Sequence, residues 1–332
     1  MKKNKVVCIG EALIDRIRNK SNLGFTDFLG GAPANVACAL RKLKIDSIFI
    51  GRLGSDDFGK KFIAKFNQLE VNLDFLQIDN NLSTRVVNVD RDQFGDRFFS
   101  GFETSPHSCF ADEALSQKFI QKELPNLEKF FQETKYLVTG TILLSSPKSA
   151  ETIFFLLEQA NKFEVKIIID LNWREVFWDY SSFSSEISKT ARVDLIKKFL
   201  NHADVLKLAK EEATLFFEHD NPSLISQEMS KRPDVIITDG ENPVSWYING
   251  FHGITKTPHS QKIIDTTGAG DAFLAGLISK LISAGYPSNK KEIQYCINFA
   301  NVCGLLTCLG EGAIEQQPDY EKVNKFLGSL IS

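Results

Sequence analysis

The chain has 332 residues, of which 43% are hydrophobic and 24% charged, and its formal net charge is −3. This length is enough for one large α/β domain or two smaller ones. Because no basic patch dominates, the composition argues against nucleic acid as a partner.

The N-terminus and the cysteines indicate a cytoplasmic protein. The basic start is followed by a short apolar run at residues 6–9, which is too short for a secretory signal and reads as a first strand. No apolar run of about 18 residues exists that could span a membrane, so we expect no membrane partner. The six cysteines form no C-x-x-C pair and no zinc pattern, which favours free thiols in a reducing compartment.

Short β-branched segments alternate with helical patterns along the chain. Strands are predicted at residues 6–9, 47–50, 136–138, 166–169, 205–208 and 235–238. Helices are predicted near residues 33–43, 58–69, 148–161, 187–200, 210–218, 269–284, 289–308 and 319–328. This alternation predicts an α/β fold with a doubly wound, mainly parallel sheet flanked by helices. No interdomain linker is present, so we expect a single domain over 1–332.

Two segments, 15–29 and 83–102, break this alternation with strand-like patterns. Residues 84–90 followed by 93–97 read as a hairpin. The two segments together predict a small β flap over the edge of the main sheet. The alternative is an ordinary surface hairpin.

Polar side chains follow the first predicted strand. Asp15 comes shortly after this strand, where open α/β sheets bind ligands, so it is placed to accept hydrogen bonds from a polyol. Gly31 and Asn35 then lie at the start of a helix, where the Asn35 amide could bind a ligand hydroxyl. The alternatives are a turn aspartate, a tight turn and a helix cap.

Residues 54–61 resemble a P-loop but fail its chemistry. Lys61 stands where Ser or Thr must bind Mg²⁺, and Asp56 and Asp57 would repel phosphates within the loop. We therefore interpret the segment as a structural turn with acidic residues at a helix start.

Two further strands are followed by polar turns. The segment 170–174 ends in Arg174, whose guanidinium could bind a hydroxyl or an anion, unless the segment is a solvated loop. Thr238 and Gly240 could line a nucleotide phosphate site, unless they belong to an ordinary hairpin.

The segment 263–273 carries the strongest signal. An apolar stretch runs through Gly268, Ala269 and Gly270 into a helix whose first turn holds Asp271. Free N–H groups and the helix dipole make such a start an anion site, and glycine lets the anion approach closely. A carboxylate beside an anion fits if it removes a proton from the group that attacks the anion. The segment therefore predicts phosphoryl transfer with Asp271 as the base.

These motifs, taken in order, resemble the ribokinase-like (PfkB) carbohydrate kinase family, and within it the fructokinases. The resemblance implies a ribokinase-like doubly wound core with a small β-sheet lid, formed by about 15–29 and 83–102. It implies that the γ-phosphate of ATP sits at Gly268-Ala269-Gly270 and that Asp271 deprotonates a sugar hydroxyl. The implied sugar contacts are Asp15, Gly31, Asn35 and Arg174.

The resemblance also implies where ATP and cations bind. The positions matching nucleotide contacts are Lys207, Thr238, Gly240 and Asn298. Glu212 matches a residue that organises Mg²⁺ through water, but Ala209 replaces the usual Asn or Ser, from which we expect altered metal dependence. Asp265 and Thr267 match two ligands of a monovalent cation, usually K⁺. Because the loop 312–318 departs from the usual pattern, K⁺ activation stays an open expectation.

We expect the substrate to be D-fructose, phosphorylated to fructose 6-phosphate, because the segments 30–36 and 170–178 resemble those of fructokinases. The alternative is a 2-keto-3-deoxygluconate kinase, which usually adds a lid Tyr that residues 97–100 lack. A catalytically silent fructokinase-like scaffold protein is the alternative outside enzymes, and the intact Gly268, Gly270 and Asp271 argue against it. The family's lids also serve as dimer interfaces, so a homodimer through the lid is expected.

Overall fold

The computed structural model describes residues 3–18, 24–91, 97–102, 109–179 and 188–331. Its main sheet contains β1 (Lys5–Ile9), β4 (Ser47–Ile50), β9 (Thr134–Thr139), β10 (Lys166–Asp170), β11 (Val205–Ala209), β12 (Asp234–Asp239), β13 (Asn242–Ile248) and β14 (Phe251–Thr255). The order is β14-β13-β12-β11-β10-β9-β1-β4. Within this sheet, β12, β11, β10, β9, β1 and β4 are parallel to one another. At the edge beyond β12, β13 and β14 are antiparallel. All six predicted strands lie in this sheet.

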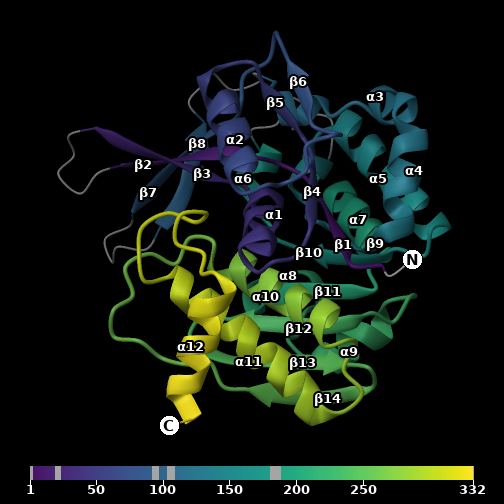
Figure 1. Cartoon of the computed structure of the whole chain (residues 1–332). Coiled ribbons are helices and arrows are strands. Elements are labelled where there is room, and N and C mark those ends of the chain that lie inside the picture. Colours follow the sequence, from purple (N-terminus) through teal and green to yellow (C-terminus); the bar gives the residue numbers. More distant parts are fainter. Residues whose placement is uncertain (1–2, 19–23, 92–96, 103–108, 180–187, 332) are drawn as a thin grey trace.

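Helices cover both faces of the main sheet (Figure 1). One core cluster includes residues of α1 (Ala32–Lys42), α2 (Asp57–Gln68), α10 (Ala269–Ser283), α11 (Lys290–Thr307) and α12 (Tyr320–Ile331). The other includes residues of α3 (Gln117–Lys122), α4 (Leu124–Glu133), α5 (Pro147–Lys162), α6 (Glu175–Asp179), α7 (Lys189–Leu200), α8 (Lys210–Phe217) and α9 (Pro222–Glu228). In β1, Val6 and Cys8 join the first cluster while Val7 and Ile9 join the second, as strand alternation requires. The doubly wound prediction is therefore confirmed.

The predicted helices are all present, with ends within about three residues of their expected limits. The helices that the sequence did not reveal are α3, α4, α6 and α9, and α6 is only five residues long. Two 3₁₀ turns, η1 (Ala111–Ala114) and η2 (Ile142–Ser145), were also missed. Except for the ten-residue α4, these are segments of one or two turns, which contain too few residues to establish a helical period.

A second, four-stranded sheet stands to one side of the main sheet (Figure 1). It contains β2 (Leu13–Arg18), β3 (Phe25–Gly30), β7 (Val86–Arg91) and β8 (Arg97–Phe102), in the order β3-β2-β7-β8. We call it the small sheet. Its strands come from the two segments that broke the alternation, although residues 19–23 and 92–96 of those segments lie outside the described residues.

The near-P-loop is a structural turn, as expected. It joins β5 (Arg52–Gly54), which pairs with β6 (Gln77–Asp79), to α2. The Asp56 carboxylate accepts hydrogen bonds from the N–H of Gly59 at 2.8 Å and of Thr84 at 2.7 Å. The N-terminus of α2 is therefore capped by the protein's own anion.

Among the described residues, no helix is long and apolar enough to cross a membrane.

Candidate active site

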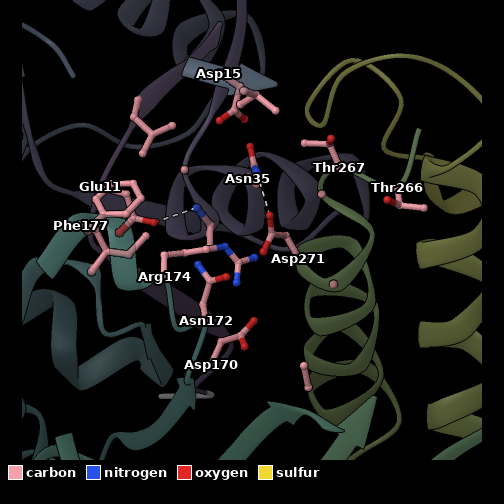
Figure 2. Close-up of a pocket in the computed structure, with 18 of the residues that line it drawn as sticks. Glu11, Asp15, Asn35, Asp170, Asn172, Arg174, Phe177, Thr266, Thr267 and Asp271 are labelled. Atoms are coloured by element: carbon pink, nitrogen blue, oxygen red, sulfur yellow. Dashed lines mark hydrogen bonds between the residues drawn. The ribbon is translucent and has the colours of Figure 1, made fainter. Parts of the chain in front are cut away.

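A cavity of about 340 Å³ opens at the carboxyl ends of the parallel strands. The starts of α1 and α10 form part of its wall, and side chains of β2 and β7 of the small sheet close another part. Most of the predicted site residues line it (Figure 2): Asp15, Gly31, Asn35, Arg174, Lys207, Glu212, Thr238, Thr267, Gly268, Gly270 and Asp271. Residues more than two hundred positions apart in the sequence therefore meet in one place.

The N-terminus of α10 faces this cavity. Gly268 caps the helix with φ 76°, and a Cβ there would lie 2.5 Å from the Cβ of Ala313, so glycine is required. Ala269 does not line the cavity, and its N–H donates to the carbonyl of Thr266 at 3.2 Å. Gly268 and Gly270 do line it. The positive end of the helix dipole is thus directed at the space where an anion would bind.

Asp271 follows directly in the first turn of α10. Its Oδ2 accepts a hydrogen bond from Nδ2 of Asn35 at 2.8 Å. Burial, and then the nearby negative charge of Asp170, raise the pKa of Asp271 to about 6. Oδ1 of Asn35 is buried and has no hydrogen-bond partner within the described residues. A carboxylate with such a pKa can accept a proton near neutral pH, and the adjacent amide oxygen can accept a ligand hydroxyl.

The side of the cavity opposite α10 is also polar. Asp15, on β2, is 6% exposed and points into the site from the small sheet (Figure 2). Gly31 has φ 97°, and a Cβ there would lie 2.6 Å from the carbonyl oxygen of Glu11, so the turn before α1 tolerates only glycine. The Arg174 guanidinium extends toward Asp271, and its Nη1 donates to the Trp173 carbonyl at 2.8 Å.

A buried ion pair forms the floor of the cavity. Nζ of Lys207, in the middle of β11, lies 2.9 and 2.8 Å from the two carboxylate oxygens of Asp170. Burial by itself lowers the pKa of Lys207, but the Asp170 charge and hydrogen bonds more than offset this and raise it. A Cβ on Gly270 would lie 3.3 Å from the Lys207 ammonium, so this charge is close to the α10 N-terminus. Thr238, at the end of β12, lines the same region.

Glu212 is held by backbone groups. Its two oxygens accept from the N–H of Trp173 at 2.6 Å and of Ala209 at 2.8 Å. Burial raises the pKa of this carboxyl group, and the charge of Asp170 adds to the effect. Glu212 therefore joins the start of α8 to the loop that follows β10, and it remains on the cavity wall.

Asp265 forms a brace behind the α10 N-terminus. Its Oδ1 accepts from the backbone N–H of Thr267 at 3.0 Å and from the Thr267 hydroxyl at 2.7 Å. Its Oδ2 accepts from the N–H of Gly312 at 2.9 Å. The loop beyond Gly312 returns to α1, where Nε2 of Gln317 donates to the carbonyl of Asn35 at 2.9 Å. Among the described residues, no group of three or more His, Cys, Asp or Glu side chains forms a metal cluster.

Two predicted nucleotide contacts lie away from the main cavity. Gly240, with φ 55°, forms the turn between β12 and β13. Asn298, on α11, lines a separate cavity of about 310 Å³ with Lys256, Tyr295 and Val302. Neither residue lines the 340 Å³ cavity.

Glu11 and Phe177 are among the lining residues that were not assigned a role from the sequence. Glu11 is 1% exposed, its Oε1 accepts from the N–H of Ala32 at 2.9 Å, and burial raises its pKa to about 8. Its position directly after the first strand was the available signal. Phe177 forms an apolar part of the wall on α6, and no sequence signal distinguished it from a core phenylalanine.

Comparisons with known proteins agree with this fold and site. The model of the pfkB family carbohydrate kinases matches residues 3–319. A probable fructokinase-5 from Arabidopsis thaliana is 30% identical, over 98% of this chain and 97% of its own length. The structure of a Xylella fastidiosa fructokinase with bound ATP has a TM-score of 0.86 and 26% identity, covering 99% and 100% of the two chains. A Vibrio cholerae O395 fructokinase with fructose, ADP and calcium ion bound has a TM-score of 0.83 and 29% identity, covering 98% and 99%.

The fold and the site define a kinase that acts on a small molecule. The chain belongs to the pfkB family of carbohydrate kinases.

Proposed function

We propose that this enzyme transfers the γ-phosphate of ATP to D-fructose and produces fructose 6-phosphate. The observation that carries the proposal is the Asn35–Asp271 hydrogen bond at the N-terminus of α10, inside the cavity. Asp271 takes the proton of the sugar hydroxyl while the hydroxyl oxygen bonds to the γ-phosphorus. The bond between that phosphorus and the β–γ bridging oxygen breaks, and ADP leaves with the electron pair.

The other site residues hold the two substrates. Asp15, Gly31, Asn35 and Arg174 bind the sugar hydroxyl groups, and the N-terminus of α10 binds the transferred phosphoryl group through its N–H groups. Lys207 and Thr238 contact the phosphates of ATP, and Gly240 and Asn298 contact the remainder of the nucleotide. Positioning and charge stabilisation supply most of the rate enhancement in phosphoryl transfer.

Cations complete the proposal. The Glu212 and Asp170 carboxylates line the cavity, and oxygen ligands of this kind fit Mg²⁺ held largely through water. Bound Mg²⁺ would neutralise phosphate charge. Asp265 and Thr267 offer oxygen atoms for a monovalent cation such as K⁺ beside the α10 N-terminus.

The choice of a neutral sugar rests on the charges in the cavity. Asp15 presents a carboxylate to the sugar side, and the Glu11 carboxyl group, whose pKa burial raises to about 8, lines the same cavity with the Arg174 cation nearby. A ketose offers hydroxyl groups to these acceptors, whereas a sugar acid such as 2-keto-3-deoxygluconate would bring a further carboxylate beside them.

A sugar panel tests the proposal. ADP production is measured with ATP and Mg²⁺ for fructose, glucose, ribose and 2-keto-3-deoxygluconate, with and without K⁺. We expect the highest kcat/KM with fructose and stimulation by K⁺. A higher kcat/KM with 2-keto-3-deoxygluconate would contradict the substrate assignment. Absence of turnover with every sugar would support the silent scaffold.

Four further features belong to the same proposal. The chain forms one kinase domain, and the small sheet acts as a lid over the sugar. Phe25, half exposed at the start of the edge strand β3, supports a homodimer through this sheet, which light scattering tests. The six free cysteines support a cytoplasmic location, which cell fractionation tests.

A further inference from the structure

A charged cluster lies fully buried where the small sheet joins the main body. Nε and Nη2 of Arg85 donate to the two carboxylate oxygens of Asp112 at 2.8 and 2.9 Å, and Nη2 lies 3.1 Å from Oε1 of Glu113. Arg85 and Asp112 are 1% exposed and Glu113 is 2% exposed. We call these three residues the Arg85 cluster.

Aromatic rings surround the guanidinium of Arg85. Its central carbon lies 4.6 Å from the ring centre of Phe110, and 5.1 Å from those of Phe102 and Phe177. Phe102 and Phe177 also contact each other edge to face at 5.3 Å. The rings provide favourable cation–π contacts, and the carboxylates fix the guanidinium plane. Arg85 therefore contacts three aromatic rings as well as two carboxylates.

This arrangement connects the small sheet to the sugar cavity. The Arg85 carbonyl accepts a hydrogen bond from the N–H of Ile14 at 2.9 Å. This bond lies where the parallel pairing of β2 with β7 begins. Phe102 ends β8, whereas Phe177 belongs to α6 and lines the cavity. One side chain thus contacts the small sheet, the η1 turn and the cavity wall.

Stability alone does not account for a buried charge here. Desolvation offsets much of the attraction within a buried ion pair, and an apolar replacement of similar volume is often equally stable. The planar guanidinium, however, fixes direction through its paired donors and stacked faces, which a lysine or an apolar side chain does not.

We propose that Arg85 is a positioning residue for the sugar site. It holds Phe177 and the root of the small sheet in the geometry that binds the sugar, and it does not contact the substrates. This inference rests on the proposed function, since it requires the sugar to bind in the 340 Å³ cavity. Its signature is a change in the KM for the sugar without a matching change in the KM for ATP.

The test compares Arg85→Lys with Arg52→Lys in the full chain. Arg52 also pairs with an aspartate, since its Nε lies 3.0 Å from Oδ2 of Asp79, but it does not line the cavity. We expect Arg85→Lys to raise the sugar KM about 10-fold, because small misplacements of a binding wall weaken binding strongly. The ATP KM should change by less than about 2-fold, and Arg52→Lys should leave both KM values unchanged.

A second variant tests the inference in case Arg85→Lys does not fold. Phe110→Leu removes the ring closest to the guanidinium, and Phe110 is not part of the cavity wall. We expect Phe110→Leu to raise the sugar KM about 3-fold, since it loosens the guanidinium without removing it. Unchanged sugar KM values in every Arg85 and Phe110 variant that folds, or equal rises in both KM values, would overturn the inference. The native enzyme is assayed with the sugar that it phosphorylates best, so a wrong choice of fructose affects only the proposed function. A native enzyme without turnover on any sugar would overturn both.

Discussion

Nδ2 of Asn35 donates to Oδ2 of Asp271 at 2.8 Å across 236 positions of sequence. This bond fixes one carboxylate oxygen and joins the first turn of α1 to the first turn of α10. Because the Asn35 backbone carbonyl is itself held by Gln317, the orientation of the base depends on three separate parts of the chain.

Replacing the proposed base should abolish most of the turnover without unfolding the protein. We expect Asp271→Asn to lower kcat by about 10²–10⁴-fold, the usual contribution of a positioned base. The matched control is Asp57→Asn, which changes an exposed aspartate in the first turn of α2. Initial rates of ADP production provide the measurement. If the two variants retained similar kcat values, Asp271 would not be the base.

The pH dependence follows from the pKa of Asp271, which burial and the charge of Asp170 raise to about 6. A base acts when ionised, so kcat/KM should rise with pH through about 6 and level off above it. The pKa of Asp271 is higher in the native state than in the unfolded chain. The free energy of unfolding should therefore fall as the pH rises from the ordinary aspartate range through about 6. At neutral pH, Asp271→Asn should therefore be at least as stable as the native enzyme in urea unfolding. A clear loss of stability would contradict this assignment of the shift.

Changing the partner of Asp271 should move the same pH profile. Asn35→Asp removes the donor to Asp271 and places a second carboxyl group against it. Because adjacent carboxylates resist joint ionisation, we expect the acid limb of kcat/KM to move upward by about one pH unit or more. Asn301→Asp is the control, since Asn301 is a buried asparagine of α11 outside the cavity. An unmoved limb in Asn35→Asp would show that the two side chains are not coupled during turnover.

The buried pair of Lys207 and Asp170 can be dissected by a double substitution. Lys207→Met leaves the Asp170 carboxylate buried without its partner, which should cost about 3–5 kcal/mol of unfolding free energy. Adding Asp170→Asn should restore most of this stability, because no buried charge is then left unpaired. The ATP KM should stay raised in the double variant if Lys207 contacts the phosphates. Recovery of both stability and ATP KM would assign the pair a purely structural role.

Metal dependence provides a separate prediction at Ala209. Ala209 begins the turn that Glu212 caps, so a polar side chain there would stand beside the Glu212 carboxylate. We expect Ala209→Asn to lower the Mg²⁺ concentration needed for half-maximal activity, because an amide oxygen is a good ligand for water or Mg²⁺. Activity is titrated against Mg²⁺ at fixed ATP in both proteins. Superimposable titration curves would show that the residue at position 209 does not affect the Mg²⁺ dependence.

The sequence predicted the strands and helices whose apolar residues recur in a regular pattern. β1 and β10 are apolar on both faces, and α10 has a clear buried stripe, so both types of element were identifiable. The helix α6 is too short to show a period, so the wall residue Phe177 stayed hidden. The antiparallel strand β13 appeared only as the second arm of a suspected hairpin after β12, and β14 was not predicted.

The candidate site was predictable where a residue follows a strand or opens a helix. Asp15, Asn35 and Asp271 were found in this way, and the structure brings them to one cavity. The Arg85 cluster was not, because the pairing of Arg85 with Asp112 depends on two segments that carry no joint signal. Gly240 was found from its place in a polar turn after a strand and Asn298 from the resemblance alone, and neither signal showed that these residues lie away from the main cavity.

The brace between Asp265 and Gly312 has a consequence for the order in which the enzyme matures during synthesis. The turn before α10 is held by Gly312, and the Asn35 carbonyl is held by Gln317, so both ends of the proposed base's support depend on residues translated after every strand of the main sheet. A ribosome-bound chain that ends before Gly312 can form β1 and α1 but lacks the hydrogen bonds that Gly312 and Gln317 make. Phosphoryl transfer should therefore begin abruptly, once Gly312 and Gln317 have been translated, and should not rise gradually as the sheet grows.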